Sequence, residues 1–139
     1  MTGLGGRMTS RMFAGALTLV ALCSISGMAS SGDAAGPAKR WAIVTFTNPV
    51  LLGDQFLMGS FLIVHDDAKM AKGEACTSIY RFDPRKGPGV EVIAFHCVPA
   101  NRAVCATTRI VLQSRGVDMP RLVEYQFAGD TEGHGVPWM

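Results

Sequence analysis

Hydrophobic and polar positions alternate along residues 40–127, in short runs rich in β-branched and aromatic side chains. No window keeps apolar residues at i, i+3, i+4 and i+7 over three turns, as an amphipathic helix would. Loops of four to nine residues, rich in turn-forming residues, separate the runs and are too short for crossover helices. The pattern predicts six antiparallel strands, at Trp41–Thr47, Gln55–His65, Ala75–Phe82, Val90–Val98, Ala103–Gln113 and Arg121–Phe127.

Six to seven such strands around one core predict an all-β fold, either a small antiparallel β-sandwich or a partly open barrel. The polar segment Asp66–Glu74 predicts a loop or one helical turn, and Gly59 predicts a bulge or bend in the second strand. The Gly-rich tail 128–139 is expected to be an irregular loop that closes an open end of the sheet. Its glycines also make Asp130, Glu132 and His134 a candidate ligand loop.

Residues 1–29 have the three parts of a secretory signal peptide. Arg7 and Arg11 give a basic start, residues 12–25 are apolar and uncharged, and Gly27-Met28-Ala29 supplies a small-residue exit. The apolar run is shorter than the roughly 20 residues that span a bilayer. We therefore expect a periplasmic or secreted protein without a membrane span after cleavage, with 30–39 as a flexible linker and 40–139 as a single β domain; an uncleaved anchor is the alternative.

Charge limits the class of partner. The whole chain has 13 Lys and Arg against 11 Asp and Glu, and removal of residues 1–29 leaves 11 of each. No basic stripe of the kind that binds a nucleic-acid backbone is present in the sequence. The expected partner is an envelope protein or a small ligand, and no nucleic acid.

Three cysteines follow the leader: Cys76, Cys97 and Cys105. Turns centred near residues 86 and 101 would place Cys97 opposite both Cys76 and Cys105, and a turn between 116 and 117 would place Arg109 opposite Glu124. In an oxidising compartment one pair is expected to bridge. A Cys76–Cys97 disulfide is favoured, since its loop of about 20 residues would stabilise the domain by roughly 3 kcal/mol. A Cys97–Cys105 bridge and three reduced, buried thiols remain the alternatives.

Histidines and cysteines together suit copper or zinc. The candidate metal ligands are His65, His96, His134 and Cys105, with Met58 and Met70 also available. His96 and Cys97 are neighbours on one predicted strand, so their side chains should point to opposite faces and not share an ion. No HxH, CxxC or HExxH motif preforms a site. A periplasmic metal-binding protein is therefore the second functional hypothesis, and otherwise no cofactor is expected.

Catalytic patterns are weak. Ser60 and Ser78 lack a GxSxG elbow, and the opposite-face geometry of His96 and Cys97 argues against a nucleophile and its base. We expect no enzymatic activity and name no catalytic residue. The leading hypothesis is a non-enzymatic exported envelope domain with a binding or structural role.

The stretch Phe46–Phe61 resembles the "F-x-x-P-x-x-V-G-…-L-P-x-G-x-Y" hairpin of small exported bacterial β-sandwich proteins of uncharacterised function. Met58 stands where those proteins have Pro or Ala, and Phe61 where they have Tyr. The resemblance implies a β-sandwich and an envelope location, and it carries over no site residue.

Overall fold

The computed structural model describes residues 38–137, and the signal-peptide prediction for 1–29 lies outside them. The fold of these residues is all-β, as predicted, but they form eight strands and one short helix rather than six to seven strands. Within the described residues no helix is long and apolar enough to cross a membrane. The elements are β1 (Lys39–Leu52), β2 (Gln55–Asp66), α1 (Asp67–Ala71), β3 (Thr77–Asp83), β4 (Gly87–Phe95), β5 (Val98–Asn101), β6 (Arg109–Gln113), β7 (Arg121–Gln126) and β8 (Glu132–Gly135).

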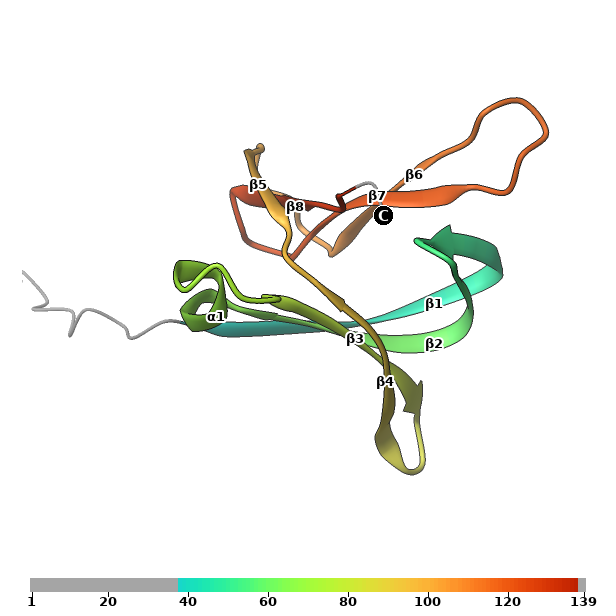
Figure 1. The fold of residues 1–139 in the computed structure, drawn as a ribbon, viewed down its shortest axis with the longest axis horizontal. Coiled ribbons are helices and arrows are strands. Elements are labelled where there is room, and N and C mark those ends of the chain that lie inside the picture. The colour runs from blue at the N-terminus through green and yellow to red at the C-terminus, as the bar shows by residue number, and fades with distance from the viewer. Residues whose placement is uncertain (1–37, 138–139) are drawn as a thin grey trace, which may run out of the picture. The chain divides into compact units, whose positions relative to one another are not determined.

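All eight strands belong to one sheet that does not close into a barrel. The order is β4-β3-β2-β1-β7-β8-β5, and β6 pairs with β7. The two halves of the sheet, β1–β4 and β5–β8, are joined by a single parallel bridge between Leu51 and Arg121. Figure 1 shows β1–β4 lying together and the strands of the other half above them. This sharp fold in the sheet produces the two layers of a sandwich.

Alternation of burial along β1 fixes which face packs inward. Ala42, Phe46 and Val50 are buried, whereas Trp41 and Ile43 on the opposite face are exposed. The spacing changes between Phe46 and Val50, where the pairing with β2 shifts register. Gly59 lies opposite Phe46 and has φ +94°, so the bend predicted there coincides with this irregularity.

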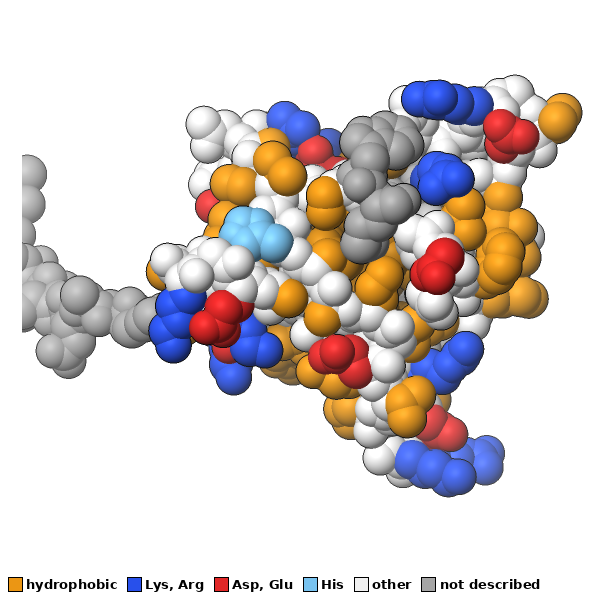
Figure 2. All heavy atoms as spheres, in the orientation of Figure 1, with side chains coloured by type: hydrophobic (Ala, Val, Ile, Leu, Met, Phe, Trp, Pro, Cys, Tyr) orange, Lys and Arg blue, Asp and Glu red, His pale blue; other side chains and the backbone are white. Residues whose placement is uncertain are grey.

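One apolar core lies between the two layers. Phe61, Ile63 and Ile79 enter it from the first half, and Tyr125 and Phe127 from the second. The layers are also joined by a hydrogen bond of 2.5 Å between the hydroxyls of Thr77 and Tyr125, both fully buried. Figure 2 shows one face of the protein, on which basic and acidic side chains lie mainly toward the hairpin ends with apolar side chains between them.

The predicted registers were partly wrong. In the β3–β4 hairpin Thr77 pairs with Phe95, one position from the expected register, because Asp83 pairs with Gly87 and the turn is therefore centred on Arg85. Register shifts between Ile79 and Phe82 bring the pairing back to within one position of the expected one. In the β6–β7 hairpin Arg109 pairs with Gln126 rather than with Glu124. A shift of two preserves the faces of the strands. Arg109 therefore still reaches Glu124 diagonally, with Nη2 3.0 Å from Oε1.

Two short strands, β5 and β8, form where the sequence predicts the end of a longer strand and an irregular tail. The predicted strand 90–98 ends at Phe95, and Val98–Asn101 forms β5, which pairs with β8 rather than with β6. Cys97 and Cys105 are therefore not opposite each other, as the alternative disulfide required. The tail is not irregular throughout, since Glu132–Gly135 is β8, between β7 and β5. Asp67–Ala71 is the single helical turn allowed for by the sequence.

We predict that Tyr125→Phe destabilises the protein by about 1–3 kcal/mol, because it leaves the buried Thr77 hydroxyl without its partner. The double variant Thr77→Val/Tyr125→Phe removes both polar groups and should recover most of the loss. Urea unfolding of the three proteins measures both effects. A double variant no more stable than Tyr125→Phe alone would contradict this account of the layer contact.

Candidate metal centre

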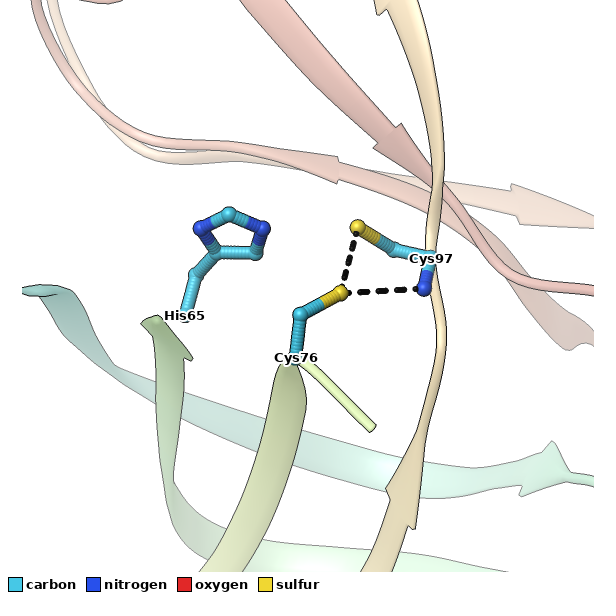
Figure 3. A group of neighbouring side chains, drawn as sticks. All are labelled: His65, Cys76 and Cys97. Carbon is cyan, nitrogen blue, oxygen red and sulfur yellow. Dashed lines mark hydrogen bonds between the residues drawn. The ribbon is translucent and has the colours of Figure 1, made fainter. Parts of the chain in front are cut away.

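Two histidines and two cysteines gather between the layers at one end of the sheet. His65 is the penultimate residue of β2, Cys76 directly precedes β3, Cys97 lies between β4 and β5, and His134 is in β8. The side chains of His65 and His134 have no exposed surface, and Cys76 and Cys97 are 2% and 0% exposed. Figure 3 shows His65, Cys76 and Cys97 projecting into the same space, with one ring nitrogen of His65 toward Cys97.

Local structure brings the first three residues together. Asp66 caps α1, accepting hydrogen bonds from Ala68 N and Lys69 N at Oδ1, so the chain reverses at once after β2. The backbone N–H of Asp66 donates to Cys76 O, 2.9 Å away, which closes the loop at the start of β3. The β3–β4 hairpin then returns the chain to Phe95, two residues before Cys97.

Glycines allow the fourth residue to approach. His134 lies between Gly133 and Gly135 in β8, which is hydrogen-bonded to β7 and β5. A Cβ atom at Gly133 would lie 2.6 Å from Glu124 Oε1, and one at Gly135 would lie 3.1 Å from Val98 O. The two glycines therefore permit close packing of three strands around His134.

The donor atoms fall into two groups of three that share His65, and each group is compact enough to hold an ion. Sγ of Cys76 and Sγ of Cys97 are 3.2 Å apart, and Cys97 Sγ is 3.5 Å from His134 Nδ1. Donor atoms of His65, Cys76 and Cys97 lie within 4.8 Å of one another, as do those of His65, Glu132 and His134. The ring centroids of His65 and His134 are 4.2 Å apart, and Tyr125 stacks on the other imidazole at 4.8 Å.

The imidazoles are buried without the hydrogen bonds that burial demands. Among the described residues, His65 Nδ1, His65 Nε2 and His134 Nε2 are buried with no hydrogen-bond partner. Asp67 Oδ1 is 3.1 Å from His65 Nδ1, but the pair does not have hydrogen-bond geometry. A buried polar atom without a partner costs about 1–3 kcal/mol. Three ring nitrogens of the two histidines are therefore available to a ligand.

Acidic residues border the histidines and share one arginine. Asp67 lies beside His65, and Glu132 Oε1 is 3.6 Å from His134 Nδ1. The guanidinium of Arg40 donates to Asp67 at 2.9 Å and to Asp130 at 2.5 Å, and lies 3.8 Å from Glu132. Arg40 thus ties β1 to α1 and to the segment leading into β8.

Burial sets the protonation of the cluster. Burial lowers the pKa of His134 to about 4, helped by the neighbouring His65 and Arg40. Burial, and then Arg40, also lowers the pKa of His65. Both rings are therefore neutral at pH 7, the form that binds a metal. Burial raises the pKa of the Cys97 thiol, with Cys76 adding to the shift, so a metal must displace a proton there.

The structure brings together some of the residues selected from the sequence and not others. Of the predicted metal ligands, His65 and His134 are in the cluster. His96 is exposed, with Nδ1 2.9 Å from Cys97 O, and Cys105 Sγ donates to Phe127 O. Of the predicted ligand loop, His134 is in the cluster, Glu132 borders it, and Asp130 is paired with Arg40.

The predicted disulfide is not formed. Cys76, Cys97 and Cys105 are all free thiols. The first two are neighbours, and the N–H of Cys97 donates to Cys76 Sγ, but a sulfur separation of 3.2 Å exceeds the roughly 2.05 Å of a disulfide bond. The hairpin arithmetic places these residues correctly beside each other, and in this structure their sulfurs are not bonded.

Comparisons with protein-family models, with curated proteins and with solved structures found no match. The site must therefore be interpreted from its own geometry.

We predict that the metal-free protein loses stability between pH 7.5 and pH 5. The pKa of His134 is about 4 in the folded state and about 6.5 when unfolded, so the unfolded chain binds more protons in this range. The stability that neutral His134 contributes is complete above pH 6.5 and declines toward pH 4, by about 1.4 kcal/mol per unit. Urea unfolding at pH 7.5 and 5.0 should differ by about 2 kcal/mol.

His96→Gln is the matched control, because His96 is exposed. It should retain the full difference between the two pH values, whereas His134→Gln should reduce it. Equal stability of the unsubstituted protein at both pH values would contradict the assignment of a buried, neutral His134.

Proposed function

We propose that this protein is a non-enzymatic domain that holds one zinc ion between the two halves of its sheet, with His65, His134, Cys76 and Cys97 as ligands. The observation that carries the proposal is the pair of fully buried imidazoles beside two buried thiols. Both ring nitrogens of His65 have no hydrogen-bond partner, and His134 Nδ1 lies 3.5 Å from Cys97 Sγ. Two cysteines and two histidines are a common ligand set of structural zinc sites.

The distances fit such a site after a small adjustment. Tetrahedral zinc with Zn–S of about 2.3 Å and Zn–N of about 2.0 Å separates two sulfurs by roughly 3.8 Å and a sulfur from a nitrogen by roughly 3.5 Å. Cys97 Sγ and His134 Nδ1 are already 3.5 Å apart. The two sulfurs, at 3.2 Å, would need to separate by about 0.6 Å.

The charges also fit. Two thiolates balance the charge of Zn²⁺, and two neutral imidazoles add none, so the buried group would be electrically neutral. Asp67 lies beside Nδ1 of His65, where a carboxylate would orient the ring and leave Nε2 for the ion. Glu132 lies beside Nδ1 of His134, the same nitrogen that faces Cys97. The guanidinium of Arg40 lies close to both carboxylates and offsets their negative charge.

A structural role follows from the closure of the site. Four protein ligands would leave no position open for water or substrate, as a catalytic zinc requires. The ligands come from both halves of the sheet, so the ion would bridge them. We further propose that the domain works outside the cytoplasm, which rests on the sequence of residues 1–29 alone.

Copper(I) is the second candidate, because thiolates and imidazoles also suit that ion. The equal number of sulfur and nitrogen donors and the carboxylates beside the histidines favour zinc.

We predict that the purified protein retains about one zinc ion per chain after dialysis. Elemental analysis by mass spectrometry measures this ratio and identifies the metal. His65→Gln and Cys97→Ser should each retain much less than one ion, because each removes a donor from the centre of the cluster. Circular dichroism shows whether each variant keeps its strands.

The chain offers matched controls in His96→Gln and Cys105→Ser, which change the same residue types outside the cluster. Both should retain zinc as the unsubstituted protein does. Stoichiometric copper in place of zinc would overturn the choice of ion. Failure of the reduced protein to bind either metal would overturn the proposed function.

A further inference from the structure

The two thiols of the cluster lie close enough to form a disulfide as an alternative to binding a metal. Sγ of Cys76 and Sγ of Cys97 are 3.2 Å apart, which lies between a disulfide bond of about 2.05 Å and the roughly 3.8 Å of two thiolates on one zinc ion. Movements of about 1 Å or less therefore separate the free thiols from either alternative.

We infer that the Cys76–Cys97 pair makes metal binding redox-dependent: the reduced pair binds the ion, and a Cys76–Cys97 disulfide excludes it. This inference rests on the proposed function, since it concerns the same site. The disulfide expected from the sequence would then be the oxidised, metal-free state of the cluster.

Both cysteines lie outside the strands. Cys76 lies just before β3 and Cys97 in the break between β4 and β5, so neither is held in a regular strand pairing. Thr77, which follows Cys76, pairs with Phe95, which lies two residues before Cys97. This pairing keeps the two segments adjacent in either state of the sulfurs.

The oxidation balances with a low-molecular-weight disulfide as oxidant. One cysteine thiolate attacks the disulfide, a mixed disulfide forms, and one small thiol leaves. The other cysteine thiolate then attacks the mixed disulfide at the protein sulfur, so that the Cys76–Cys97 bond forms and the second small thiol leaves. The protein loses two protons and two electrons, and the oxidant is reduced to two thiols.

The disulfide and the metal exclude each other because they use the same electron pairs. Oxidation leaves His65 and His134 without their sulfur partners and removes the two negative charges that would balance the ion. Conversely, a bound ion holds both sulfurs, and attack on an oxidant then requires the site to open. Because both cysteines are buried, the oxidant reaches them only through such opening.

The experiment uses full-length Cys105→Ser protein, which leaves Cys76 and Cys97 as the cysteines of the described domain. Reduced protein, metal-free or loaded with zinc, is treated with oxidised glutathione, and peptide mass mapping follows the Cys76–Cys97 bond over time. Competition with a chromophoric chelator then measures the zinc affinity of the reduced and oxidised proteins.

We expect metal-free protein to form the bond, and zinc at 100 times its Kd to slow bond formation by about 100-fold. The oxidised protein should bind zinc about 100-fold more weakly than the reduced protein, and dithiothreitol should restore the affinity. Cys76→Ser/Cys105→Ser is the matched control, and it should give no internal bond in the described domain.

The outcomes separate the two proposals. If the reduced protein binds zinc but the bond does not form, or forms at one rate with and without zinc, the redox inference fails and the zinc site stands. Equal zinc affinity before and after oxidation has the same consequence. If the reduced protein binds no zinc, the proposed function fails, and the inference falls with it.

Discussion

The structure depends on the burial of His65, His134, Cys76 and Cys97 in one cluster between the two halves of the sheet. Backbone pairing joins β1–β4 to β5–β8 only at the bridge between Leu51 and Arg121, so side chains must hold the layers together elsewhere. At the opposite end of β1 from this bridge, the side chains that do so include two imidazoles with unpartnered nitrogens. A metal ion would turn this unfavourable burial into a cross-link.

Much of the fold could be predicted from the sequence because it depends on local alternation. β2 and β7 begin and end within one residue of the predicted ranges, β1 continues to Leu52 beyond its predicted end at Thr47, and the hairpin arithmetic places Cys76 and Cys97 side by side. β5 and β8 were missed because each has only four residues, and their apolar pattern is interrupted by Pro99 or by glycine. Such strands form through pairing with distant partners, which local patterns do not encode.

The site was predicted less completely. His65 and His134 were selected by residue type, and their approach depends on β8 pairing with both β5 and β7. The sequence favours a disulfide between Cys76 and Cys97, so Cys105 is the cysteine in the predicted set of metal ligands, and it lies outside the cluster. The exclusion of a shared ion for His96 and Cys97 agrees with the structure, in which His96 is exposed and Cys97 is buried. Gly133 and Gly135 were the strongest available signal, because they permit the close approach of strands that buries His134.

X-ray absorption at the zinc edge of the reduced, full-length protein loaded with one equivalent of zinc tests the central claim most directly. The account predicts two sulfur neighbours at about 2.3 Å and two imidazole nitrogens at about 2.0 Å. The same spectrum should lose its sulfur component in a Cys76→Ser/Cys97→Ser variant. A first shell made only of oxygen and nitrogen in the unsubstituted protein would contradict a zinc site built on Cys76 and Cys97.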